Sequence, residues 1–113
     1  MIPKSEWVWY GFAGHLCVSR RCAYHLCTKI GNRLVSTVGA FFPDDDVMQP
    51  IAGPNDYYET MVFECSGEDR YGNPFLDSLS ELERHVYGGS IAAELGHRNI
   101  CIRVAAKQEG ECE

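Results

Sequence analysis

A histidine and a cysteine separated by one residue occur twice near the start of the chain, as His-Leu-Cys at residues 15–17 and again at residues 25–27. Because side chains two apart on a strand point to the same face, each pair could supply two ligands to a tetrahedral zinc ion. One more cysteine lies between the two motifs. The candidate metal ligands are His15, Cys17, Cys22, His25 and Cys27.

Hairpin geometry divides these five residues. If residues 18–21 form a loop, Cys17 faces Cys22, and both lie with His15 on the face opposite His25 and Cys27. A one-residue slip in the register or a β-bulge would bring all five side chains to the same face. His15, Cys17 and Cys22 already share a face, so these three could hold zinc without a slip or a bulge. Buried thiols and hydrogen-bonded core histidines explain the same pattern, so we expect no cofactor and keep zinc as the alternative.

An enzyme would need a general base, and the chain offers histidines for that role. A glutamate or Cys22 would orient the base or act as the nucleophile. The sequence has no glycine-rich phosphate loop and no nucleophile elbow, and nothing in it fixes the distances between the candidates, so we favour a protein without enzymatic activity. The candidate catalytic residues are His15, His25, Tyr58, Glu59 and His97.

The length and net charge of the chain limit the number of domains and the kinds of partner it can bind. The 113 residues fit one domain, residues 1–113, in which we expect residues 108–113 to form a flexible tail. Sixteen acidic against ten basic residues give a net charge of −6, which argues against direct binding of nucleic acid. No apolar run approaches the ~20 residues of a membrane span and the chain begins without a signal-peptide pattern, so we expect a cytoplasmic protein without membrane contact.

The clearest predicted element is a β-hairpin. Two strand-like runs, residues 22–30 and 33–42, flank Gly31-Asn32, a pair that tolerates the positive φ angles of a two-residue turn. Facing residues should then sum to 63, which places Thr28 opposite Val35. The register also defines two faces of the hairpin.

Those two faces differ in chemistry. The more apolar face has Tyr24 opposite Gly39, where the tyrosine ring would cover the bare backbone of the glycine. The other face carries both polar and apolar side chains: His25, Cys27, Lys29, Leu34, Ser36 and Val38. Because this second face is mixed, we expect it to be partly wet or to form a site.

The second half of the chain completes the predicted fold. Residues 58–65 alternate in polarity like another strand with one core-facing side. Ser78 and Glu81 match a capping box and predict a short helix, and a last helix is expected to begin at Ser90. The predicted fold class is α+β, a small antiparallel sheet built on a central β-hairpin (about 22–42) with one or two helices in the C-terminal half.

Short motifs from about Trp9 to about Ala105 form a distinctive combination, of which Tyr58 to Phe63 is the most specific part. The other motif residues are Gly14, His15, Cys22, Tyr24, His25, Leu26, Thr28, residues 34–39, Pro43, Leu82, Glu83, Tyr87, Ala93, Gly96 and His97. Together they resemble a family of short bacteriophage-encoded proteins of unassigned role. Ala40 departs from that family, which often has an acidic residue there, and no cysteine follows Cys65 closely, so a metal site shared with the family is not expected.

The resemblance implies a phage or prophage product that acts in the cytoplasm of a bacterial host. Small acidic phage proteins are often inhibitors of host machinery, including anti-CRISPR and other anti-defence proteins, so by analogy we expect a host protein as the partner. Aromatic anchors with a charged rim suit such an interface, and the exposed edge of a strand could also support a homodimer. The predicted contact residues are Trp7, Trp9, Asp44, Asp45, Asp46 and Tyr57.

Overall fold

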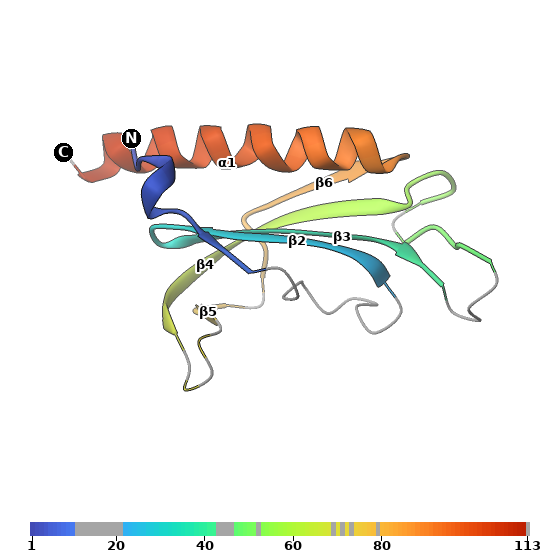
Figure 1. Ribbon diagram of the computed structural model, residues 1–113, viewed down its shortest axis with the longest axis horizontal. Helices are drawn as coiled ribbons and strands as arrows, with labels where there is room; N and C mark the ends of the chain where they lie inside the picture. Colours follow the sequence, from blue (N-terminus) through green and yellow to red (C-terminus); the bar gives the residue numbers. More distant parts are fainter. Residues whose placement is uncertain are drawn as a thin grey trace.

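In the computed structural model, an antiparallel sheet carries a long helix across one of its faces (Figure 1). This architecture confirms the predicted α+β class. The structure describes residues 1–10, 22–42, 47–51, 53–68, 70, 72, 74–78 and 80–112. The elements in chain order are the 3-10 helix η1 (Lys4–Glu6), β1 (Val8–Trp9), β2 (Cys22–Ile30), β3 (Arg33–Phe41), β4 (Tyr58–Glu68), β5 (Pro74–Leu76), β6 (Glu83–Tyr87) and α1 (Ser90–Cys112).

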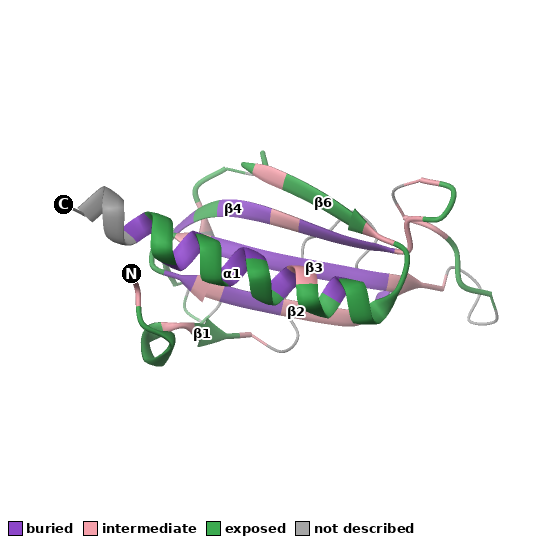
Figure 2. Cartoon of the chain, turned by 90° about the horizontal axis from the view of Figure 1, so that it is seen from above, coloured by how far each residue is buried: buried purple, intermediate pink, exposed green. Residues whose placement is uncertain are grey.

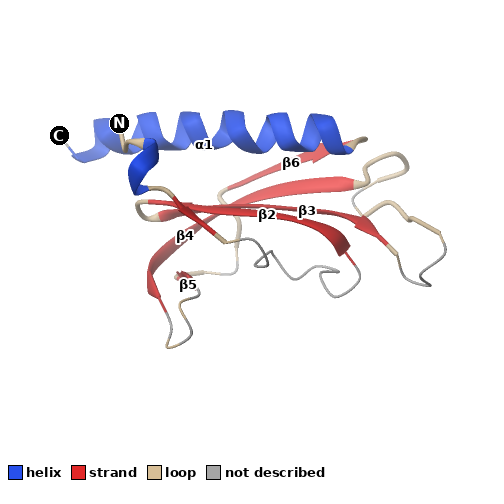
Figure 3. Cartoon of the chain, in the orientation of Figure 1, coloured by secondary structure: helices blue, strands red, loops and turns tan. Residues whose placement is uncertain are grey.

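The strands follow the order β1-β2-β3-β4, which Figure 2 shows from above, and every pairing is antiparallel. Figure 3 shows the same strands nearly edge-on, with the helix α1 above them. The first half of β4, Tyr58 to Val62, also pairs with β6. Its second half pairs with β5 at Cys65 and Glu68, where the register shifts. β1 and β6 are therefore the outermost described strands of the main sheet, and α1 lies over the face between them (Figure 2).

The central hairpin forms in the predicted register. Facing residues of β2 and β3 sum to 63, as the pair Thr28 and Val35 shows. Gly31 has a φ angle of 59°, the left-handed conformation that this turn requires and that glycine adopts without strain. Because β3 also pairs with β4, the hairpin occupies the middle of the sheet.

Gly39 makes room for a tyrosine from the third strand of the sheet. A Cβ at position 39 would overlap the ring of Tyr58 in β4. Tyr24 lies opposite Gly39, as the hairpin register predicted, and packs in a T-shaped contact against Tyr58 with ring centroids 5.3 Å apart, but the ring nearest to Gly39 is that of Tyr58. The hairpin alone could not reveal this arrangement, because the covering ring comes from a strand outside it.

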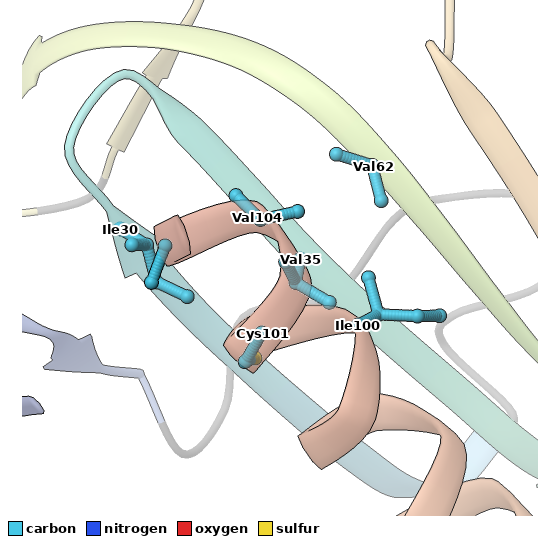
Figure 4. Packing of buried hydrophobic residues seen from close by; sticks show 7 residues of the cluster. Ile30, Val35, Val62, Ile100, Cys101 and Val104 are labelled. Carbon is cyan, nitrogen blue, oxygen red and sulfur yellow. The ribbon is translucent and has the colours of Figure 1, made fainter. Parts of the chain in front are cut away.

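The main core lies between α1 and the sheet face predicted to be the more apolar one. Its buried residues come from the three central strands and from the inner face of the helix: Ile30, Val35, Val62, Ile100, Cys101, Val104 and Ala105 (Figure 4). The opposite face of α1 is exposed to solvent (Figure 2). Because each fully buried aliphatic side chain contributes roughly 1.5–3 kcal/mol, this contact supplies a large part of the stability of the fold.

The sheet face that we expected to be partly wet is also packed. Cys27, Leu34, Phe63 and Cys65 form a second buried cluster, and Tyr10 lies against it. Cys27 and Cys65 have no exposed surface at all. The expectation of a wet face is therefore wrong for these residues, because Tyr10, which follows β1, and Leu76 of β5 add cover that the hairpin pattern does not encode.

The short helix predicted from the capping box at Ser78 and Glu81 is wrong. This part of the chain forms β6 instead, in which Val86 pairs with Glu59 of β4. Leu82 and Val86, two apolar side chains of this segment, remain 47% and 39% exposed. The free hydrogen-bonding edge of β4 outweighs a helix tendency that buries little apolar surface.

The last helix is confirmed and is longer than its apolar pattern suggested. It spans Ser90–Cys112, so residues 97–107 are helical rather than extended. Gln108, the first residue of the predicted tail, is buried, and its side chain bonds to the backbone of Ile30 and Asn32. Flexibility of residues 109–113 stays a prediction. Within the described residues no helix is both long and apolar enough to cross a membrane.

Replacing Gly96 by alanine should destabilise the protein, although alanine is normally the better helix former. A Cβ at this position would overlap the ring of Tyr87, which packs against α1 from β6. We expect Gly96→Ala to lower the free energy of unfolding by roughly 1–3 kcal/mol, as overpacking does. Urea denaturation followed by circular dichroism measures the change.

Gly89 provides the matched control for this substitution. No atom lies within 4 Å of a Cβ built there, so Gly89→Ala meets no steric overlap and should cost only the roughly 0.5–1 kcal/mol by which alanine is the poorer N-cap residue. If Gly96→Ala stabilises the protein by the usual helical gain, the contact between Tyr87 and α1 is refuted.

Candidate functional site

A hollow bordered by exposed apolar side chains lies between the amino-terminal segment and α1. We call it the Trp9 groove, and its volume is about 520 Å³. Its walls are formed by Lys4, Trp7, Trp9, Leu95, Arg98, Asn99 and Ile102, and Thr28, His97 and Cys101 form its floor. Three predicted residues, Trp7, Trp9 and His97, therefore come together in one place.

Backbone hydrogen bonds fix the outer wall of the groove at both ends. The amide of Ile2 donates to the carbonyl of Ala105 at 3.1 Å, and the indole of Trp7 donates to the carbonyl of Ile2. At the other end, Trp9 pairs with Thr28 in β2, and the amide of Tyr10 donates to Cys27 at 2.7 Å. The wall is thus anchored both to the helix and to the sheet.

Exposed apolar side chains face each other across the groove. Trp9 is 60% exposed, while Leu95 and Ile102 of α1 are 57% and 46% exposed. Leu95 and Ile102 share a stripe of the helix because seven residues are nearly two turns. These large apolar groups gather at one hollow instead of being scattered singly over the surface.

The floor of the groove contains a buried histidine whose ring nitrogens are both engaged. His97 is only 2% exposed, its Nδ1 lies 2.7 Å from the hydroxyl of Thr37, and its Nε2 lies 3.0 Å from the hydroxyl of Thr28. Thr37 is in turn 2.5 Å from the hydroxyl of Thr60. The imidazole ring and the Trp9 ring form a T-shaped contact, with ring centroids 6.4 Å apart and planes at 82°.

This environment makes His97 unsuitable as a general base. Burial, with a smaller contribution from Arg98, lowers the pKa of its imidazole to about 4. The ring is therefore neutral near pH 7, and its one donor and one acceptor are both used by threonines. The sequence did not predict three of the site residues: Thr28, Thr37 and Thr60. The strand pattern places them on one face of the sheet, but it does not show that His97 packs on that face.

The charged side chains that line the groove are both cations. Lys4 comes from η1 and Arg98 from α1, and no acidic residue is found among the described residues of the lining. Arg98 is paired with Glu94 one turn earlier, at 3.0 Å, but both side chains are largely exposed and such pairs are weak. The rim is thus locally positive on a chain whose net charge is −6.

The described catalytic candidates are divided between the two faces of the sheet. His97 and Tyr58 lie on the face that α1 covers, whereas Glu59 and His25 point to the other face. Glu59 is buried and accepts a hydrogen bond from Arg84 at 2.7 Å. Val38 separates Glu59 from His25 in the register, so these four residues form no common cluster, and His15 lies outside the described residues.

The described members of the predicted zinc site also form no common cluster. His25 and Cys27 share a face as expected, but Nε2 of His25 lies 2.7 Å from the carbonyl of Cys22, and its buried Nδ1 has no partner. Among the described residues there is no group of three or more histidine, cysteine or acidic side chains suited to a metal. His15 and Cys17 lie outside the described part of the chain, so a zinc site that includes them stays a prediction.

Of the remaining predicted contact residues, the structure describes only Tyr57, which is not among the residues that line the groove. Tyr57 is half-buried and its carbonyl accepts a hydrogen bond from Ala40, near the open end of the hairpin. Asp44, Asp45 and Asp46 lie outside the described residues. Of the predicted contact surface, the structure therefore assembles the two tryptophans.

Comparisons with known proteins add no relative to this picture. No family model, curated protein or solved structure matches the chain. The similarity to short bacteriophage proteins therefore stays a prediction from the sequence, and the role of the groove must be argued from its own geometry.

Acid should destabilise the fold through His97. Because the pKa of its imidazole is about 4 in the folded state and about 6.5 when exposed, the unfolded chain binds the proton first as the pH falls. Stability from this group is complete above about pH 6.5 and is lost as the pH falls towards 4. Between pH 7 and pH 4.5 we expect a loss of about 2 kcal/mol in the free energy of unfolding.

The variant His97→Gln separates this effect from other titrations. Glutamine keeps a donor and an acceptor but does not titrate, so the pH slope above pH 4.5 should flatten. Glu83, whose pKa Arg103 lowers to about 2, would still contribute below its ordinary pKa of 4.5. An unchanged slope in the variant would rule out His97 as the source.

The four described thiols should be inert in the folded protein. Cys22, Cys27, Cys65 and Cys101 are all buried, and burial raises the pKa of Cys27 to about 12 and that of Cys101 to about 11. In a Cys17→Ser/Cys112→Ser variant, a thiol reagent at pH 8 should react at least ~100-fold more slowly than after unfolding. A rapidly reacting thiol in the native variant would contradict this packing.

Proposed function

We propose that the chain is a binding protein that holds an apolar segment of a partner protein in the Trp9 groove. The observation that carries this proposal is the exposure of Trp9, Leu95 and Ile102 around one hollow with a rigid floor. A large exposed aromatic beside aliphatic groups is what an interface anchor requires. His97 contributes a fixed surface rather than chemistry, since both of its ring nitrogens are occupied.

Covering Trp9 would supply a useful share of binding energy. The side chain is 60% exposed, which at about 25 cal/mol per Å² corresponds to roughly 3 kcal/mol if a partner buries the rest. Its wall is already ordered by pairing with β2, so little conformational entropy is lost when a partner binds. A pre-formed groove of this kind favours a partner segment that inserts one or two apolar side chains.

The charge of the rim indicates what flanks those apolar side chains. Lys4 and Arg98 stand on opposite walls, so carboxylates on either side of the inserted residue would meet a cation. These exposed charges affect partner selection and association rate more than affinity. The partner segment is therefore apolar at its centre and acidic at its ends.

The resemblance to short phage proteins supports a proposal about where the partner comes from. It implies a protein of the bacterial host, and binding that blocks a host factor, as anti-defence and anti-CRISPR inhibitors do, is the proposed biological role. Plating efficiency of a phage on a host with active immunity tests this role. Expression of the wild-type chain should raise it, and expression of Trp9→Ala should not.

Photocrosslinking tests the groove itself. A benzophenone amino acid at Ile102 should capture a discrete partner from bacterial lysate, whereas the same probe at Val86 in β6 should not, although Val86 is also exposed (39%). Excess unmodified protein should compete with the capture, and excess Trp9→Ala should not. Mass spectrometry of the adduct then identifies the partner and the inserted segment.

Affinity for the identified partner gives the decisive comparison. Titration calorimetry should show at least ~30-fold weaker binding for Trp9→Ala and for Leu95→Ser, because each removes apolar contact at the groove. Val86→Ala serves as the control and should change the affinity less than twofold. Equal affinity of wild type and Trp9→Ala, with both variants folded, would exclude the groove as the binding site.

A further inference from the structure

A second hollow is lined by residues of α1, β3, β4 and β6. Figure 2 shows that β4 and β6 lie on the flank of α1 away from β1. Its volume is about 360 Å³, within the range of small-molecule pockets, and it shares no lining residue with the Trp9 groove. Its apolar floor is formed by Val62, Leu82 and Val104. We call it the α1–β6 pocket.

Three of the ten basic residues of this acidic chain surround that floor. Arg33 comes from the start of β3, and Arg103 and Lys107 lie one turn apart on α1. Glu83 is the one carboxylate among the described residues of the lining. Counting these side chains leaves two positive charges in excess, which is the reverse of the net charge of the whole chain.

Hydrogen bonds hold two of these cations in place. Nη1 of Arg33 donates to Oδ1 of Asn32 at 2.9 Å. Arg103 donates through both Nη atoms to the carboxylate of Glu83, at 3.0 and 2.5 Å. The Lys107 ammonium has no ion-pair partner among the described side chains. Charges fixed in this way need little rearrangement when an anion arrives.

We propose that the α1–β6 pocket binds a small molecule that carries a dianionic phosphate on an apolar body. Guanidinium and ammonium groups are the side chains that hold phosphate oxygens, and the phosphate is expected beside Arg33 and Lys107, away from Glu83. The body of the ligand would cover Val62 and Val104. A long polyanion is disfavoured because the net charge of −6 repels it beyond the pocket.

Phenyl phosphate is a suitable probe for this site in the full-length protein. Two-dimensional NMR titration should show saturable shifts centred on residues 33, 103 and 107. Inorganic phosphate should bind at least ~3-fold more weakly, because it lacks the apolar body. Potassium chloride at matched ionic strength should not reproduce the shifts, which separates a specific site from general screening.

Variants that replace a cationic side chain by glutamine test which residues bind phenyl phosphate. Lys107→Gln, at an exposed position of α1, and Arg33→Gln should each weaken phenyl phosphate at least ~5-fold. The control Lys29→Gln removes a cation from the face of the sheet opposite α1 and should leave binding unchanged. Trp9→Ala should also leave it unchanged, so failure of the proposed groove would not be mistaken for failure of this pocket.

Two results would overturn the proposal. One is phenyl phosphate binding that is equally strong in Lys107→Gln and in the wild type. The other is a set of shifts that chloride reproduces at the same ionic strength, which would reveal screening of exposed charges only. Because Lys107 is exposed, its replacement does not threaten the fold, and the first comparison remains valid even if Arg33→Gln is poorly folded.

Discussion

His97 links α1 to the sheet through Thr28 of β2 and Thr37 of β3, and Thr37 extends the contact to Thr60 of β4. Apolar packing presses the helix onto the sheet but tolerates sliding, whereas these hydrogen bonds have one satisfactory arrangement. A shift by one turn would leave several buried polar groups unpaired, at about 1–3 kcal/mol each. The position of α1, and with it the shape of both hollows beside it, depends on this network.

The two flanks of α1 differ in chemistry because different strands face them. On the β1 side, tryptophans meet Leu95 and Ile102, and the result is an apolar groove with a cationic rim. On the β6 side, the margin of the helix carries Arg103 and Lys107 above an aliphatic floor. One element thus presents a surface suited to a protein segment and a pocket suited to a small anion, without sharing residues between them.

Sequence patterns revealed the parts of the fold that depend on local turns and alternation. The turn at Gly31 fixes the register of β2 and β3, and alternation marks β4, so the central sheet could be predicted. β6 could not, because its strand form depends on pairing with β4 while its own residues match a helix cap. Trp7, Trp9 and His97 were identified as candidates, but their meeting in one groove depends on where α1 lies, which no local pattern encodes.

The hairpin turn also brings together segments from the two ends of the described chain. A Cβ on Gly31 would meet the side chains of Ile2 and Gln108, and the side-chain amide of Gln108 donates to the carbonyl of Ile30, 78 residues away. Such contacts require closure of very long loops before they stabilise anything. The contact between Gln108 and Ile30 therefore carries the loop-closure cost of most of the domain, whereas the hairpin itself closes through a two-residue turn.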